Sequence, residues 1–107
     1  MSSSAIILFA HGARDPDWAL PLERIRDQLR AAGTRVELAF LEFMSPSLQD
    51  AAARLAGEGI EAVTIVPLFL AQGGHLKRDL PEMVASIRER HAKTAFRVTP
   101  ALGEAPE

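Results

Sequence analysis

Four short apolar runs alternate with longer amphipathic stretches along the chain. The runs cover residues 5–10, 36–41, 62–70 and 96–99. Short apolar runs bounded by turn residues are typical of strands buried in a parallel sheet. Their alternation with helical segments predicts an α/β fold with right-handed crossovers. We therefore expect one three-layer domain over residues 1–107, in which helices flank a four-stranded parallel sheet with strand order 2-1-3-4.

The first helix is expected directly after the first strand. Asp15 is a suitable N-cap, Pro16 suits the first helical position, and Gly33 suits the C-terminal stop. Four large apolar residues between these signals follow one another at helical spacing, namely Trp18, Leu22, Ile25 and Leu29.

Two more helices are expected further along the chain. Ser45-Pro46 repeats the cap-and-proline signal before the second helix, which ends at residues 57–59. Pro67 marks the place where regular pairing of the third strand stops. Residues 71–75 are expected to form a loop, and the third helix begins at either Lys77 or Asp79. Residues 100–107 are too few and too polar for a further packed helix.

Composition narrows the classes of function. Hydrophobic residues make up 48% of the chain and charged residues 24%, which argues for a folded domain. The net charge of -2 argues against a nucleic-acid partner. Because the chain has no cysteine, a metal would be held by His, Asp or Glu, which suits borderline divalent ions. The apolar run near the N-terminus is too short for a membrane span, so we expect a cytoplasmic protein without a membrane partner.

Three candidate metal ligands follow three different strands. Ligands of open α/β sheets bind beyond the carboxyl ends of the strands, where His11, Glu42 and His75 are predicted to lie. Each residue also has a simpler interpretation. His11 could cap a strand, Glu42 could be a solvated carboxylate, and His75 could be an exposed loop histidine; both interpretations stay open for each residue. His91 lies late in the third helix, away from this end of the sheet.

The neighbours of these histidines point to an anionic ligand. Arg14, Lys77 and Arg78 flank the two histidines on a chain of negative net charge. Gly73 and Gly74 precede His75 and suggest a loop that approaches a ligand closely or moves. The chain has no Walker P-loop, no G-x-G-x-x-G after the first strand and no G-x-S-x-G elbow, so nucleotide-driven and serine-hydrolase chemistries are disfavoured.

Several segments resemble the small sirohydrochlorin cobaltochelatases, class II chelatases that need no ATP. These segments are HGARD at residues 11–15, VELAFLE at 36–42, VPLFL at 66–70 and GGHLKRDLP at 73–81. The resemblance implies a chelatase fold related to flavodoxin-like sheets. It also implies insertion of cobalt into sirohydrochlorin on the way to cobalamin, with no permanently bound cofactor. Relatives that use iron or nickel make Fe²⁺ and Ni²⁺ the alternatives to Co²⁺ as the metal substrate.

The same resemblance suggests roles for individual residues. His11 and His75 match the metal-handling histidines of the family, and Glu42 matches the position of an acidic partner between them. Arg14, together with Lys77 and Arg78, would then steer the carboxylates of sirohydrochlorin or a related tetrapyrrole. The glycine pair would let the loop that carries His75 open for this large, flat substrate.

Three further expectations concern assembly and alternatives. The active small members usually continue into a final helix, which this chain is expected to lack. A third strand that is apolar at almost every position predicts an exposed apolar face and hence a homodimer. The alternatives to an enzyme are a module that binds metal or tetrapyrrole without turnover, and a purely structural partner subunit.

Overall fold

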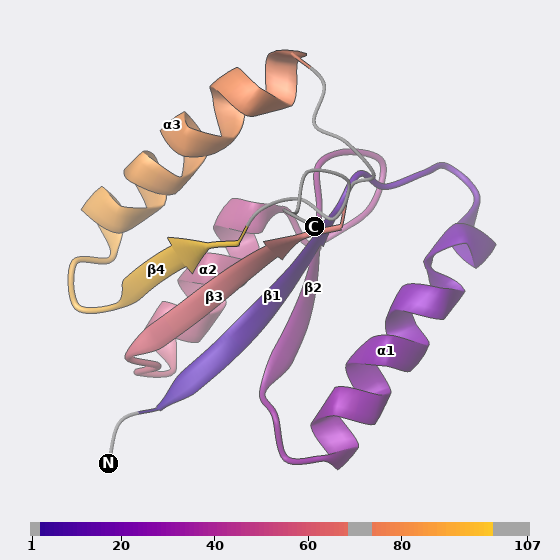
Figure 1. Cartoon of the computed structure of the whole chain (residues 1–107), viewed down its shortest axis with the longest axis horizontal. Helices are drawn as coiled ribbons and strands as arrows, with labels where there is room; N and C mark the ends of the chain where they lie inside the picture. The colour runs from indigo at the N-terminus through magenta and orange to yellow at the C-terminus, as the bar shows by residue number, and fades with distance from the viewer. Residues whose placement is uncertain (1–2, 69–73, 100–107) are drawn as a thin grey trace, which may run out of the picture.

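A four-stranded parallel sheet in the order β2-β1-β3-β4 forms the centre of the molecule (Figure 1), which confirms the predicted fold class and strand order. The computed structural model describes the backbone of residues 3–68 and 74–99, and the side chains of these residues except 74–78. The elements in chain order are β1 (Ser4–Ala10), the 3-10 helix η1 (Pro16–Ala19), α1 (Leu20–Ala31), β2 (Val36–Phe40), α2 (Leu48–Gly57), β3 (Ala62–Pro67), α3 (Gly74–Arg90) and β4 (Ala95–Val98).

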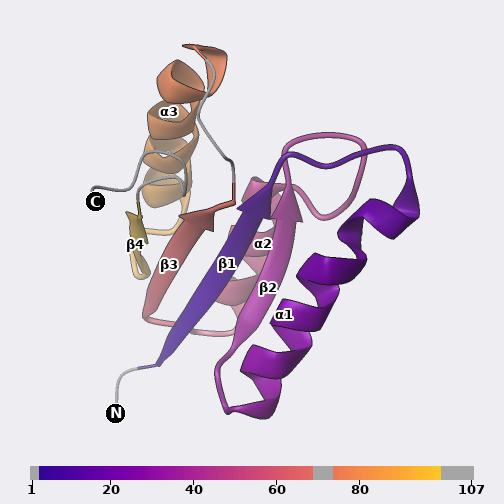
Figure 2. The same cartoon turned by 45° about the vertical axis from the view of Figure 1, so that its right-hand side comes forward.

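Two cores lie on the two faces of the sheet, because successive side chains of a strand point to opposite faces. Ile7 and Phe9 of β1 pack with α2 and α3 on one face, while Leu8 and Ala10 pack on the α1 face. Figures 1 and 2 show α1 alone on its side of the sheet and the other two helices on the opposite side. Each large apolar side chain buried in this way stabilises the fold by about 1.5–3 kcal/mol.

The start of the first helical segment differs in detail from the prediction. Asp15 is the N-cap, and its carboxylate accepts a hydrogen bond from the backbone N–H of Asp17, but Pro16 opens a 3-10 turn before α1 begins at Leu20. Gly33, at φ 95°, follows the end of α1 as predicted. Of the four apolar residues at helical spacing, two pack against the core, namely Leu22 and Leu29, and two are exposed, namely Trp18 and Ile25.

The start of α2 is a correction to the sequence interpretation. Ser47 is its N-cap and accepts a hydrogen bond from the N–H of Asp50, whereas Ser45-Pro46 lies in the preceding loop. The Phe40 N–H donates to the carbonyl of Pro46 at 2.9 Å, which folds this loop back onto the end of β2. The cap signal was therefore correct in kind and two residues too early.

The start of α3 is a second correction. The helix begins at Gly74, so Gly74 and His75 belong to its first turn and not to a loop. Asp79 and Glu82 consequently lie inside the helix, where they cannot form a capping box. The helix is placed by an apolar stripe of Leu80, Val84 and Ile87, which are buried in the core with α2. β3 ends at Pro67, as its lack of an N–H predicted, and Gly73 and residues 100–107 lie outside the described residues.

β3 is buried mainly on one face. Val63 and Ile65 are buried under α2 and α3, whereas Ala62 is exposed and Thr64 and Val66 are half-buried on the α1 side. An incompletely covered face of this strand, on the α1 side, agrees with the sequence interpretation, and the homodimer inferred from it stays a prediction. The α1 side tolerates exposure because it is partly polar there, as the Nε of Arg97 donates to the hydroxyl of Thr64 at 3.0 Å.

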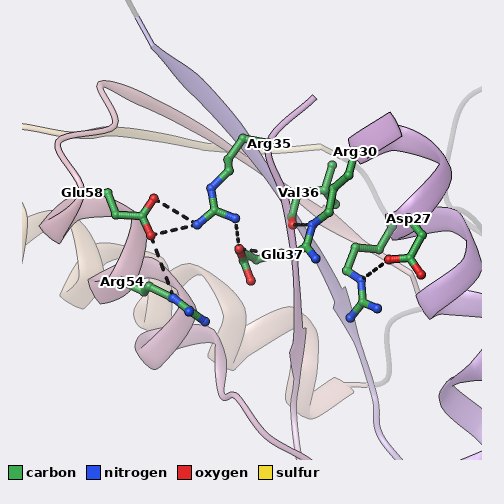
Figure 3. A network of polar contacts seen from close by, with 8 residues as sticks. Asp27, Arg30, Arg35, Val36, Glu37, Arg54 and Glu58 are labelled. Carbon is green, nitrogen blue, oxygen red and sulfur yellow. Dashed lines mark hydrogen bonds and ion pairs between the residues drawn. The ribbon is translucent and has the colours of Figure 1, made fainter. Parts of the chain in front are cut away.

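A network of arginines and glutamates closes the amino end of the sheet (Figure 3). Arg35 donates to both carboxylate oxygens of Glu58, at 3.0 and 2.8 Å, and it also pairs with Glu37. Arg30 of α1 reaches the same glutamate, Glu37, at 3.3 Å, and its Nε donates to the carbonyl of Val36. The hydrogen bond to Glu58 is the main cause that raises the pKa of Arg35 above its ordinary value. These contacts fasten the ends of α1 and α2 to the start of β2.

Candidate functional site

The carboxyl ends of β1 and β2 bring His11 and Glu42 together. Backbone bonds continue past the strands, since the Leu41 N–H donates to Ala10 at 2.9 Å and the Glu42 N–H donates to His11 at 3.0 Å. Nε2 of His11 consequently lies 3.2 Å from Oε1 of Glu42. Two of the three predicted metal ligands are therefore neighbours, as expected from the strand order.

Gly12 allows this close approach of the two loops. It has a φ of 94°, which residues with a side chain rarely adopt. A Cβ atom at this position would lie only 1.9 Å from the backbone carbonyl oxygen of Glu42. Because the obstruction is backbone, it cannot be relieved by turning a side chain, and glycine is required where β1 passes β2.

The two ring nitrogens of His11 face two different oxygen atoms. Nδ1 lies 3.1 Å from the carbonyl oxygen of Gly12 and Nε2 lies 3.2 Å from Oε1 of Glu42, and both oxygens can only accept a hydrogen bond. A neutral imidazole carries one hydrogen, so it can donate to only one of these oxygens at a time, and its tautomer decides which. When the hydrogen is on Nδ1, the Nε2 lone pair and the Glu42 carboxylate suit a shared cation, either a proton or a metal ion.

Both side chains are accessible to a ligand. The exposed fractions of the side chains are 52% for His11 and 49% for Glu42. Within the described side chains, no group of three or more His, Asp or Glu residues is arranged to hold a metal ion. His11 and Glu42 are of residue types that bind divalent metals, but two side chains are fewer than a metal centre needs, and their role as ligands stays a prediction.

Arg14 lies at the same end of the sheet and stacks on an aromatic ring that the sequence interpretation missed. The guanidinium carbon of Arg14 lies 5.1 Å from the ring centroid of Phe43. Phe43 directly follows Glu42, has a φ of 69° and is 55% exposed. An aromatic residue between a strand end and Ser45-Pro46 was the signal in the sequence, but its backbone conformation and its partner depend on the fold.

The remaining predicted site residues belong to the start of α3 or precede it. Gly74, His75, Lys77 and Arg78 lie in the first turns of this helix, whose N-terminal end is at the carboxyl end of the sheet (Figures 1 and 2). Their side chains, and the whole of Gly73, lie outside the described residues. The convergence of His75 on His11 and Glu42 stays a prediction.

Two cavities are lined by other described residues, one along β2 as far as Phe40, Ser45 and Pro46, and one beyond the end of α3. One, of about 500 Å³, runs along β2 and is lined by Arg26, Arg30, Arg35 and Arg54 together with Glu23 and Glu37. All four arginines pair with carboxylates, so they hold the fold and offer little charge to an anion. The other, of about 430 Å³, adjoins His91 beyond the end of α3, where the His91 ring lies 6.3 Å from that of Phe96. The position of His91 away from the candidate site is confirmed.

Comparison with protein families identifies the group to which these features belong. The CbiX family model matches residues 5–107. The chain belongs to the CbiX family. Among relatives, the CbiX chain is 37% identical over 82 residues to the sirohydrochlorin cobaltochelatase of Methanopyrus kandleri, covering 75% of this chain and 57% of the relative. It is 35% identical over 83 residues to the sirohydrochlorin cobaltochelatase of Sulfurisphaera tokodaii, covering 78% of this chain and 69% of the relative.

Solved structures give the same grouping. A CbiX protein from Marinobacter aquaeolei VT8 matches with a TM-score of 0.83 and 33% identity, over 98% of this CbiX chain and 84% of that one. The sirohydrochlorin chelatase SirB of Bacillus subtilis subspecies spizizenii, in complex with cobalt, matches with a TM-score of 0.78 and 24% identity, over 92% and 43%. At that identity the second likeness shows the fold alone. Of the described helices, none is long and apolar enough to cross a membrane.

Proposed function

We propose that this chain inserts a divalent metal, with cobalt as the first candidate, into sirohydrochlorin without ATP. The proposal is supported by the two curated relatives, which are sirohydrochlorin cobaltochelatases and of which this chain spans 57% and 69%. The observation that carries it is the pairing of His11 Nε2 with the Glu42 carboxylate at 3.2 Å, in an exposed position beyond the strand ends.

Metal insertion requires that the metal loses its bound water and that two pyrrole nitrogens lose their protons. A neutral imidazole with its lone pair on Nε2 can bind a borderline divalent ion or accept a proton near neutral pH. In the tautomer with its hydrogen on Nδ1, the His11 ring would donate to the Gly12 carbonyl at 3.1 Å and present the Nε2 lone pair to the metal or the proton. Glu42 would be the second ligand, or would receive the proton that His11 takes from a pyrrole nitrogen.

His75 would complete the site from the other side. It lies in the first turn of α3, at the carboxyl end of the sheet, and would supply a further metal ligand or proton acceptor. Lys77 and Arg78 in the same turns, with Arg14 near His11, would attract the peripheral carboxylates of the tetrapyrrole. Gly73 and Gly74, before His75, would allow this segment to adjust to the substrate. Iron and nickel remain the alternative metals, since they prefer similar ligands.

The protein would act as a single domain that pairs with a second copy. A tetrapyrrole is broad and flat, and this domain offers one wall for it. A longer solved chelatase, of which this chain matches 43%, has room for a second wall within one chain. Pairing of two identical chains would supply such a second wall. Sedimentation of the protein at micromolar concentration tests whether the chains pair. A monomer that inserts metal at full rate would contradict the pairing. A cytoplasmic location remains a prediction.

The proposed function is tested by the absorbance of sirohydrochlorin over time with Co²⁺, with and without the protein. We expect the spectrum of the metallated product to appear faster with protein, in the absence of any nucleotide. A module that only binds would shift the spectrum of sirohydrochlorin without accelerating insertion, and a structural subunit would do neither. Repeating the assay with Fe²⁺ and Ni²⁺ ranks the metals.

A further inference from the structure

We propose that Phe43 is a substrate-recognition residue, whose ring and the Arg14 guanidinium stacked on it form a platform for one face of the tetrapyrrole. This inference rests on the proposed function. It names the residues that would orient the tetrapyrrole over His11 and Glu42. It is carried by the position of Phe43 in the chain, by its backbone conformation and by its exposure.

The position of Phe43 is fixed relative to the metal ligands. It directly follows Glu42, whose backbone N–H is bonded to the carbonyl of His11 at 3.0 Å. The backbone N–H of Leu41, the residue before Glu42, donates to the carbonyl of Ala10 at 2.9 Å. The Phe43 backbone is therefore held one residue from Glu42, in a loop that is hydrogen-bonded to the loop carrying His11.

The backbone conformation of Phe43 is unfavourable for its residue type. Within the described residues it is the one non-glycine residue with positive φ, at 69°. Asparagine, aspartate or glycine would adopt this conformation with less strain, and a bulky residue there is a true outlier. Such strain persists mainly where a function requires it.

Packing does not account for an aromatic side chain at this position. Phe43 is 55% exposed, the largest exposed fraction among the large hydrophobic residues that the structure describes. It belongs to neither of the two buried cores. A residue that stabilised the loop by burial would be covered, so its ring is better explained by a ligand that covers it.

The chemistry of the pair suits a tetrapyrrole. An aromatic ring prefers to stack against another flat conjugated surface, and a guanidinium can pair with a carboxylate while it stacks on a ring. The Arg14 guanidinium, 5.1 Å from the Phe43 centroid, presents both properties side by side. Sirohydrochlorin combines a flat conjugated core with peripheral carboxylates, so it fits this pair better than a small inorganic anion does.

The test compares Phe43→Ala, Phe43→Asn and Phe43→Trp with Ile25→Ala. Asparagine removes the ring but tolerates positive φ, tryptophan restores an aromatic surface, and Ile25 is another exposed apolar residue, on α1. Binding of metal-free sirohydrochlorin is followed by its absorbance, and Co²⁺ insertion gives KM and kcat. Thermal unfolding reports on the fold, and calorimetry with Co²⁺ alone reports on metal binding.

We expect Phe43→Ala and Phe43→Asn to raise the Kd and KM for sirohydrochlorin about three- to tenfold, the factor typical of an aromatic contact. Binding of Co²⁺ alone should stay unchanged, Phe43→Trp should bind within about twofold of the wild type, and Ile25→Ala should behave as the wild type. If the wild type inserts metal and the asparagine variant binds sirohydrochlorin equally well, the inference about Phe43 is wrong and the proposed function stands. A wild type that neither binds sirohydrochlorin nor inserts metal would overturn both. Loss of a dimer in Phe43→Asn, with tetrapyrrole affinity unchanged, would assign the ring to a second copy of the chain and would also contradict the inference.

Discussion

The two ends of the sheet both carry charged side chains, but these are arranged for opposite purposes. At the amino end, Arg30 and Arg35 share Glu37, which is largely buried, and each positive group has a carboxylate partner. At the carboxyl end, Nε2 of His11 and the Glu42 carboxylate lie 3.2 Å apart, and both side chains are about half exposed. The first arrangement satisfies its charges internally and stabilises the fold, whereas the second suits a cation from outside.

The largest effect should come from removing the histidines of the carboxyl end. We expect His11→Ala and His75→Ala each to lower the rate of metal insertion about 100-fold or more, which is the scale of losing a ligand or a proton acceptor. The fold should be retained, because His11 is exposed and its loss opens no cavity in the core. The measurement is the initial rate of Co²⁺ insertion, with the circular dichroism spectrum as control.

Glu42→Gln sharpens this prediction. The amide keeps the size of the side chain but loses the negative charge 3.2 Å from His11, so we expect a smaller fall in rate than for either histidine. A near-normal rate in His11→Ala would remove the basis for the proposed site. Such a result would mean that the His11 side chain only caps the end of β1 by hydrogen bonding.

Gly12→Ala should impair both stability and activity. The new Cβ would lie 1.9 Å from the carbonyl oxygen of Glu42, at a φ of 94°, so the two loops must separate. We expect a loss of about 2–3 kcal/mol in the free energy of unfolding and a lower insertion rate. Gly57→Ala in α2 is the matched control, because a Cβ there meets nothing within 4 Å. Equal melting temperatures for the two variants would contradict the close approach.

Glu37→Ala should affect stability alone. It leaves Arg30 and Arg35 without their shared partner, and because both arginines are partly exposed, we expect a loss of about 1–2 kcal/mol. Because the pKa of Arg35 is raised, the stability that its charge brings is fully present below the ordinary pKa of arginine and is lost as the pH rises through the raised pKa. The difference in melting temperature from the wild type should therefore be the same at pH 7 and pH 9. A fall in insertion rate per folded molecule would show that the two ends are coupled.

The smallest effect should be that of salt on substrate capture. Attraction between exposed cations and tetrapyrrole carboxylates is screened over about 10 Å at 0.1 M salt, so the affinity for sirohydrochlorin should fall a few-fold as salt rises. Arg14→Gln should reduce this dependence, whereas Arg24→Gln, which changes the net charge equally on the exposed side of α1, should not. Equal salt dependence in the two variants would exclude Arg14 as a steering residue.

Much of the fold was predictable because its signals are local or follow from topology. The apolar runs predicted all four strands, and the strand order then placed Glu42 beside His11, although the two residues are 31 positions apart in the sequence. The start of α3 was misjudged because Asp79 and Glu82 imitate a capping box, while the helix is positioned by the burial of Leu80 and the residues that follow it on the same face.

Other features were not predictable because they depend on contacts between distant segments. The positive φ of Phe43 and its contact with Arg14 arise only once the loops after β1 and β2 are bonded to each other. The pairing of Arg35 with Glu58 likewise requires α2 to end beside the start of β2. No sequence period marks either contact.

The free edge of β2 has a consequence for aggregation. Successive carbonyls of a strand point to opposite sides; Arg35 directs its carbonyl to Ile6 of β1, so the carbonyl of Val36 points outward, where Arg30 binds it. At the other end of the strand, the outward N–H of Phe40 donates a hydrogen bond to the carbonyl of Pro46. A strand from another molecule would have to displace both bonds before it could pair along this edge. The protein should therefore resist growth of the sheet from the β2 edge at high concentration.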